Sequence, residues 1–221
     1  MMFNFFRKNI SSPPPDLKNI SRDIHSHILP GIDDGSPDVE TSLQLIKGLY
    51  DLGISKMVAT PHIIGDMYRN TPELINNALQ KLKLACSHAG LNIEISAAAE
   101  YMLDDFFMEL LRKKEPLLTL SKNLILTELS YVAAPGNLEE ISFEIITGGY
   151  QPILAHPERY PYYNKNFKSF YHLKELGFML QVNLLSLTGY YGSAVARAAK
   201  FLFEKDLVDF VGTDMHHAGH L

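Results

Sequence analysis

A short β-rich run followed by a helical stretch recurs about seven times from residue 20 onward, and this alternation constrains the fold most strongly. The β-rich runs cover 21–27, 55–61, 92–99, 123–128, 151–156, 178–183 and 207–213. The helical stretches cover 38–52, 72–90, 102–113, 137–148, 167–176 and 193–205. Strands that alternate with helices predict parallel strands joined by right-handed crossovers, and thus an α/β fold. A unit of about 30 residues suits either a (β/α) barrel or an open doubly wound sheet.

Two of the predicted helices begin with capping signals. Ser36 and Pro37 precede the stretch 38–52, and we expect Ser36 to cap that helix. Thr71 and Pro72 repeat the same pattern further on. Near-continuous apolar strands such as NLILT fit a sheet that is buried on both faces.

Composition limits the class of protein. With 221 residues, 46% of them hydrophobic, the chain predicts one globular domain over 21–221, preceded by a tail and a proline-rich linker over 1–20. A formal charge of −5 argues against a nucleic-acid partner, which would require a basic patch. No apolar run approaches the roughly 20 residues of a membrane-spanning helix.

The single cysteine, Cys86, excludes a disulfide within the chain and favours a reducing compartment, so we expect a cytoplasmic protein. Cys86 lies in an apolar-periodic helical stretch with no basic or glycine-rich segment after it. We therefore predict a packing residue rather than a nucleophile.

Histidines and carboxylates stand at the ends of six of the seven predicted strands. These strand-end residues are His25, His27, His62, Glu100, Glu128, His156, Asp214 and His216. The loops at the carboxyl ends of the strands form the active sites of barrel enzymes. An unpaired buried carboxylate is costly, so this repetition favours groups that converge on cations. In the loop after the first strand, Asp34 is a further candidate ligand, whereas its neighbour Asp33 is expected only to shape the turn.

Each of these residues also has a structural explanation when it is taken singly. His62 and His156 would fit hydrogen-bonded histidines of the core. Glu100 and Glu128 would fit carboxylates at helix starts, where the helix dipole favours them. Asp34 would fit a turn or a helix cap. Only the joint pattern favours metal binding.

Nine donors exceed the three or four protein ligands of a catalytic zinc ion and suit two or three ions. Imidazole and carboxylate ligands without a thiolate favour manganese, iron or zinc. Four carboxylates carry −4, and three divalent ions would leave an excess of about +2 that attracts an anion such as a phosphate ester. Arg159, three residues after His156, is the expected bidentate partner of the phosphate, and Arg69 is a weaker second candidate.

Five segments, in this order and spacing, resemble the polymerase and histidinol phosphatase (PHP) superfamily. They are DIHSHILPGIDDG, VATPH, the strand-end Glu100, HPER and TDMH. Within that superfamily the chain is most similar to the manganese-dependent bacterial protein-tyrosine phosphatases of the CpsB/YwqE type. The resemblance covers about residues 21–217. It implies a distorted (β/α)7 TIM-like barrel of the PHP type and three divalent ions, with Mn²⁺ first and iron or zinc as alternatives.

The resemblance also implies how the ligands divide among the ions and which residues act. One ion would be held by His25, His27, Glu100 and Asp214. A second ion would be held by Glu100, Glu128 and His156. The third ion would be held by Asp34, His62 and His216. Glu100 would bridge two ions. The catalytic residues would be Arg159, Glu128 and His62, with a metal-activated hydroxide as nucleophile. The substrate would be phosphotyrosine on the tail of a bacterial tyrosine kinase of capsule or exopolysaccharide synthesis.

Two positions depart from the pattern of the family. Ile63 stands where a second histidine usually follows TPH. The chain stops at Leu221, where relatives continue through a loop and helix, so either it is truncated or a closing element is missing.

Three alternatives stay open. The same scaffold would serve a small-molecule phosphomonoesterase, such as one for histidinol phosphate. A non-catalytic metal-binding module would dock a kinase tail without turnover. Metal-dependent amide hydrolysis usually employs a carboxylated lysine, and no predicted strand ends in lysine.

Overall fold

The computed structural model describes residues 16–20 and 22–221, in which nine strands form two parallel sheets. The first sheet has the order β1 (Arg22–Asp23), β2 (Lys56–Ala59) and β4 (Glu94–Ala97). The second has the order β3 (His62–Ile63), β5 (Glu100–Met102), β6 (Leu124–Glu128), β7 (Gln151–Ala155), β8 (Met179–Asn183) and β9 (Phe210–Gly212). Every pairing between these strands is parallel, as the alternating pattern predicts.

The chain passes from one sheet to the other through short segments that are not part of any strand. Thr60 and Pro61 separate β2 from β3, and residues 98–99 separate β4 from β5. Across these breaks the Glu100 N–H donates to the Pro61 carbonyl. Beyond β1 and β9, a parallel bridge pairs Ser26 with Met215. Several predicted single strands are therefore interrupted at the point where their polar residues begin.

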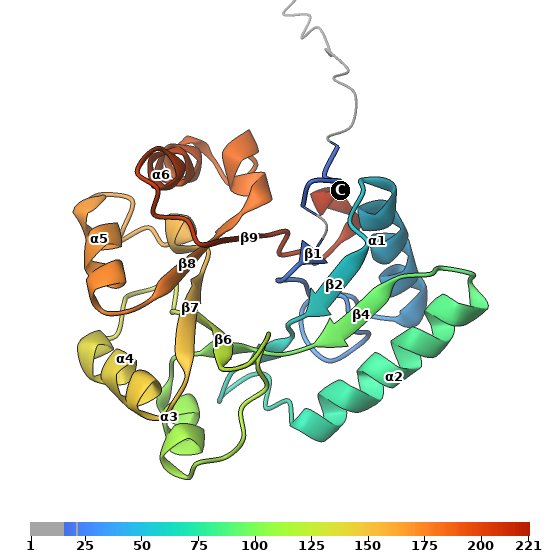
Figure 1. The fold of residues 1–221 in the computed structure, drawn as a ribbon, viewed down its shortest axis with the longest axis horizontal. Coiled ribbons are helices and arrows are strands. Elements are labelled where there is room, and N and C mark those ends of the chain that lie inside the picture. Colours follow the sequence, from blue (N-terminus) through green and yellow to red (C-terminus); the bar gives the residue numbers. More distant parts are fainter. Residues whose placement is uncertain (1–15, 21) are drawn as a thin grey trace, which may run out of the picture.

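Six helices lie around the outside of the strands (Figure 1). They are α1 (Val39–Asp51), α2 (Pro72–His88), α3 (Asp105–Arg112), α4 (Leu138–Thr147), α5 (Lys168–Glu175) and α6 (Ser193–Glu204). Short 3-10 helices cover η1 (Pro157–Arg159), η2 (Leu184–Thr188) and η3 (Ala218–His220). All six predicted helices are present within a few residues of their expected ends.

The helix caps agree with the prediction in one case and not in the other. Thr71 caps α2, and its side chain accepts from the Leu74 N–H. The prediction that Ser36 caps α1 is wrong, because Asp38 is the N-cap and accepts from the Thr41 N–H. Ser36 instead donates its hydroxyl to the Asp38 carbonyl, which stabilises the turn before the helix.

The strands bury both faces. On β6 and β7, Ile125 and Leu154 belong to the main apolar core, which also contains residues of all six helices. Leu126 and Ile153 form a second, smaller apolar cluster on the other, inner face. Because successive side chains alternate, Glu128 lies on the same inner face as Leu126, at the carboxyl end of the strand. The inner face is thus apolar along the middle of the strands and polar at their carboxyl ends.

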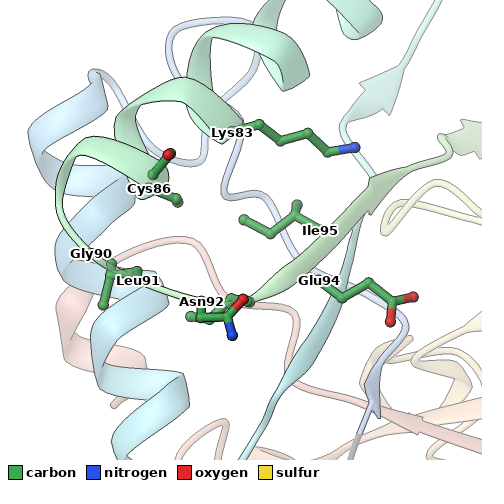
Figure 2. A pocket seen from close by; sticks show the side chains of 9 residues that line it. Lys83, Cys86, Gly90, Leu91, Asn92, Glu94 and Ile95 are labelled. Carbon is green, nitrogen blue, oxygen red and sulfur yellow. The ribbon is translucent and has the colours of Figure 1, made fainter.

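A cavity of about 490 Å³ lies between the C-terminal end of α2 and β4, at the amino end of that strand (Figure 2). Cys86 borders it and is buried, as predicted for a packing residue, and burial raises the pKa of its thiol. The cavity contains none of the strand-end histidines or carboxylates. It is therefore separate from the candidate site.

Part of the predicted tail is attached to the domain. The Leu17 N–H donates to the Leu52 carbonyl at the end of α1, and Leu17 packs against the main core. Residues 1–15 of that tail lie outside the described residues. None of the described helices is long and apolar enough to cross a membrane.

Candidate metal centre

All nine predicted ligands converge at the carboxyl ends of the strands. They fall into four overlapping groups in which the ligand atoms lie within 4.8 Å of one another: His27, Asp34, His62 and His216; His25, His27 and Glu100; His25, His156 and Asp214; and His62, Glu100 and Glu128. The grouping differs from the division that the resemblance implies, since His156 falls with Asp214. The division among ions therefore stays a prediction.

Glu100 lies at the middle of this cluster and is fully buried. Its Oε2 atom lies 3.3 Å from Nε2 of both His25 and His27 and 3.2 Å from Nδ1 of His62. Its Oε1 atom lies 3.1 Å from Nε2 of His156. One carboxylate thus contacts four imidazoles, which is the position expected of a bridging ligand.

Four buried polar atoms of the cluster make no hydrogen bond of regular geometry within the described structure: His62 Nδ1, Glu100 Oε2, Glu128 Oε1 and His156 Nδ1. His62 Nδ1 nevertheless lies 2.8 Å from Glu128 Oε1. A buried polar atom without a partner is destabilising. Their lone pairs lie among other donors suited to manganese, iron or zinc. The residues present therefore fit divalent cations.

The rings of His25 and His27 are oriented by hydrogen bonds at Nδ1. The Gln181 Oε1 atom lies 2.7 Å from His25 Nδ1, and Asp33 Oδ2 lies 2.8 Å from His27 Nδ1. An acceptor at Nδ1 holds the proton there and leaves the Nε2 lone pair free to bind a cation. Both Nε2 atoms point at Glu100.

Asp33 therefore does more than the turn-shaping that its sequence suggests. Its Oδ1 atom accepts from the Gly35 N–H at 3.0 Å, while Oδ2 accepts from the His62 N–H and orients His27. Gly35 is required because a Cβ atom there would lie 2.2 Å from the His27 carbonyl oxygen. This close approach folds the DDG segment back over the strand end.

Replacing Asp33 with asparagine should weaken metal binding by about 10- to 100-fold, because an outer carboxylate that orients a histidine ligand contributes to affinity. Asparagine offers one oxygen where both Asp33 oxygens accept hydrogen bonds, so either Gly35 or His27 loses its acceptor. Calorimetric titration of the metal-free protein with Mn²⁺ measures the change. Asp51→Asn, in an exposed pair with Lys47, is the matched control. Equal affinities for the two variants would contradict the assignment.

Strand β8 carries no predicted ligand, yet it holds the site together. Gln181 donates to Asn183 Oδ1 at 2.9 Å, and Asn183 Nδ2 donates to Asp214 Oδ2 at 2.8 Å. Together with the Gln181–His25 contact, these bonds link two candidate ligands through β8. In the sequence LQVN the two amides alternate, which places both on one face of the strand and indicates a shared environment. This signal is missed when only histidines and carboxylates are considered as site residues.

Two of the candidate ligands adopt left-handed backbone conformations. His156 has φ of 37° and Asp214 has φ of 53°. Non-glycine residues rarely adopt this conformation, which costs on the order of 1–3 kcal/mol and recurs at functional sites. His156 follows the last residue of β7, and Asp214 is separated from β9 by Thr213; both side chains lie within the cluster.

The electrostatics of the metal-free cluster are dominated by close pairs. Burial opposes protonation of His25, but Glu100 and Asp214 outweigh it and raise its pKa to about 9. Burial lowers the pKa of His156 to about 4. Burial and the neighbouring Glu100 raise the pKa of Glu128 to about 7. The cluster therefore binds protons that divalent cations must displace, so metal affinity should fall at low pH.

Exposure increases toward one side of the cluster. The side chains of Glu100, His25 and His27 are fully buried, whereas that of Asp34 is 53% exposed. The pKa of Asp34 is lowered to about 2, first by its hydrogen bond with His216. Among the candidate ligands, Asp34 is thus the side chain most open to solvent.

Arg159 lies at the cluster, as predicted, while the contacts of Arg69 are with other residues. Arg159 Nη1 donates to Asp214 Oδ2 at 2.5 Å, and its side chain is 22% exposed. Arg69 donates to the Gly65 carbonyl and lies over the Phe106 ring. A role of Arg69 in substrate binding stays a prediction.

Glu158, between two site residues of HPER, is fully buried. It accepts from the Asn183 N–H and from the Ser186 hydroxyl, but burial still raises its pKa to about 7. These bonds connect η1 to the end of β8. The carboxyl group thus holds the Arg159 segment against Asn183.

Glu158→Gln should change how stability depends on pH. The ordinary pKa of Glu158 is 4.5, so between pH 4.5 and 7 the unfolded chain releases a proton that the folded chain keeps. Glu158 therefore contributes fully to the free energy of unfolding below about pH 4.5. This contribution, on the order of 3 kcal/mol, is lost by about pH 7. Glutamine removes this loss. Urea unfolding of the metal-free proteins at pH 5 and pH 8 measures it, with exposed Glu175→Gln as control. Parallel pH curves for Glu158→Gln and the natural chain would be the contrary result.

A family model described as capsular polysaccharide synthesis, CpsB/CapC, matches residues 21–220. The tyrosine-protein phosphatase YwqE of Bacillus subtilis (strain 168) is 30% identical over 195 residues, which cover 88% of this chain and 77% of that protein. The tyrosine-protein phosphatase CpsB of Streptococcus pneumoniae is 32% identical over 202 residues, covering 88% and 82%.

Among solved structures, one from a study of YwqE from Bacillus subtilis and CpsB from Streptococcus pneumoniae, described as metal-dependent tyrosine phosphatases, superposes with a TM-score of 0.82. It is 30% identical and covers 89% of this chain and 80% of its own. An amidohydrolase from Mycoplasma synoviae shares the fold, with a TM-score of 0.54 at 15% identity over 91% and 74% of the chains. Because the CpsB/CapC family model matches nearly the whole of this chain, the chain belongs to the CpsB/CapC family.

Proposed function

We propose that this chain is a metal-dependent protein-tyrosine phosphatase that hydrolyses phosphotyrosine on a tyrosine kinase of capsule or exopolysaccharide synthesis. The observation that carries the proposal is the convergence of nine imidazole and carboxylate donors on one buried cluster beside Arg159. The relatives named as tyrosine-protein phosphatases support the same reaction. Three divalent ions, Mn²⁺ first, fit the number and kind of donors.

Divalent cations held by these nine residues would supply positive charge for a phosphate ester and activate the attacking water. The residues of the chain then have separate tasks. Arg159 binds phosphate oxygens through its guanidinium, whose two N–H edges match a phosphate. Asp33 and Gln181 orient the imidazoles of His27 and His25. The single cysteine lies buried in α2, so the proposed reaction uses no thiol nucleophile.

His62 and Glu128 remain the other proposed catalytic residues. His62 Nδ1 lies 2.8 Å from Glu128 Oε1, and both atoms are buried. The His62 side chain is 11% exposed and Glu128 4%, so both lie beneath the more open Asp34. This position suits groups that would hold divalent cations in the buried part of the cluster.

The test is hydrolysis of a phosphotyrosine peptide that has the sequence of a tyrosine-rich kinase tail. The purified chain with Mn²⁺ should release phosphate, and EDTA should abolish the release. Histidinol phosphate in a parallel reaction distinguishes a small-molecule phosphatase, which would turn it over faster. Tight binding of the peptide without turnover would identify a docking module instead. Activity that survives complete metal removal would overturn the proposal.

The proposal includes a distorted (β/α)7 barrel of the PHP type as the scaffold. The breaks between β2 and β3 and between β4 and β5 interrupt single strands, and the Ser26–Met215 bridge brings the first and last strands together. When β2 and β3 are counted as one strand, and β4 and β5 as another, the nine strands become the seven that are expected. The domain proposed for this scaffold spans 21–221.

A further inference from the structure

Two tyrosines flank the guanidinium of Arg159. The Arg159 Cζ atom lies 4.3 Å from the ring centroid of Tyr191 and 5.3 Å from that of Tyr131. Cations are attracted to the faces of aromatic rings, and the attraction grows when water is excluded. Arg159, the residue proposed to bind the phosphate, therefore lies against two aromatic rings rather than in open solvent.

Tyr131 extends from the centre toward solvent. Its ring stacks on the His156 ring, with centroids 5.9 Å apart and planes inclined by 24°, yet the residue is 41% exposed. Val132, the next residue, is 92% exposed. An exposed aromatic ring that continues from a candidate metal ligand offers a face to a substrate ring. Aromatic rings pack favourably in offset or edge-to-face arrangements.

Tyr191 has a polar group beside the expected phosphate. Its hydroxyl oxygen is buried and has no hydrogen-bond partner among the described residues. Burial raises the pKa of this hydroxyl to about 12, so it keeps its proton and acts as a donor. Buried donors usually have an acceptor. A phosphate oxygen held by Arg159 would supply one.

The backbone around both tyrosines is built to hold them. Gly189 and Gly192 bracket Tyr190 and Tyr191 with φ of 84° and 95°, a conformation that glycine adopts without strain. On the other side of Arg159, the Tyr162 hydroxyl donates to the carbonyl of Ser130, the residue before Tyr131. The glycines thus permit the turns on either side of Tyr191, and the Tyr162 bond ties down the residue before Tyr131.

We infer that Tyr131 and Tyr191, together with Arg159, form the aryl-phosphate subsite of this chain. Tyr131 packs against the aromatic ring of the substrate, and Tyr191 donates its hydroxyl to a phosphate oxygen. The inference rests on the proposed phosphatase function and explains why an aryl ester would be preferred to an alkyl ester. Tyr131 sets selectivity, whereas Tyr191 strengthens binding of every phosphate.

Calorimetric binding of phenylphosphonate and methylphosphonate to the Mn²⁺-loaded protein tests the two roles separately. The natural chain should bind the aryl compound more tightly. Tyr131→Leu should reduce that preference by about tenfold, the scale of one lost aromatic contact. Tyr131→Phe, which keeps the ring, should retain it. Tyr171→Leu is the matched control, because Tyr171 is also 41% exposed and its ring contacts Phe201 on α6.

Tyr191→Phe should weaken both phosphonates by about tenfold and leave their ratio unchanged, since only the hydroxyl is removed. An unchanged aryl preference in Tyr131→Leu, or unchanged affinities in Tyr191→Phe, would overturn the inference. Tyr131→Gln serves as a second ring-deleting variant if the leucine variant does not fold. Failure of the natural chain to hydrolyse the phosphotyrosine peptide would instead refute the proposed function. The two failures are therefore distinguishable.

Discussion

Replacing Glu100 with glutamine is expected to lower kcat for a phosphotyrosine peptide by at least about a thousandfold, the scale on which loss of a central electrostatic group reduces catalysis. Its two oxygens contact four imidazoles at 3.1–3.3 Å, which places Glu100 at the centre of the candidate ligands. Glutamine has nearly the same shape but carries no charge. It should fail to hold two cations close together.

The expected loss is measured as kcat at saturating Mn²⁺, and metal content after gel filtration should fall with it. Glu94→Gln is the matched control. Glu94 lies at the amino end of β4 in exposed pairs with Arg22 and Lys56, and exposed pairs contribute little to stability. That control should keep full activity and metal content. If Glu100→Gln retained more than about a tenth of the natural kcat, Glu100 would not be the bridging ligand.

Replacing Arg159 with alanine should lower kcat/KM for the same peptide by about 100- to 1000-fold. The guanidinium is held 2.5 Å from Asp214 and between the rings of Tyr131 and Tyr191, so it is preorganised to receive phosphate. Arg159→Lys should recover part of the loss, because lysine keeps the charge but not the planar pair of donors.

Metal content separates this effect from damage to the centre. Asp214 keeps its contacts with Asn183 and His25 when Arg159 is shortened, so bound Mn²⁺ should persist. Arg197→Ala provides the control, since Arg197 lies exposed on α6 and contacts Ser193. A variant Arg159→Ala with natural kcat/KM would remove Arg159 from the site. Loss of metal together with activity would assign it to the centre rather than to the substrate.

Much of the fold follows from local sequence pattern. The helices appear within a few residues of where apolar periodicity places them, because period and capping act over neighbouring residues. Several strands are shorter or interrupted, and the first covers only Arg22–Asp23 of the predicted 21–27. The cap of α1 shows the limit. Ser36 and Asp38 both suit an N-cap, and the choice between them depended on the turn that precedes the helix.

The outer contacts of the site were not predictable in the same way. His25 and Gln181 are 156 residues apart in the chain, and Asn183 and Asp214 are 31 apart. The alternation in LQVN places both amides on one face of the strand, but it does not indicate which residues they contact. Their roles depend on which segments become neighbours, and Gln181 on β8 meets His25 only in the folded chain.

The sequence by itself predicted which histidines and carboxylates come together in the candidate centre. In parallel strands the carboxyl ends lie at one edge, so histidines and carboxylates at strand ends had to meet. Tertiary structure alone decided how they are held and what surrounds them. Tyr131 and Tyr191 reach Arg159 from other segments of the chain. The left-handed turns at His156 and Asp214 are conformations that local propensity disfavours. The Asp33–His27 bond is close in sequence, but it forms where the segment folds back over the strand end at Gly35.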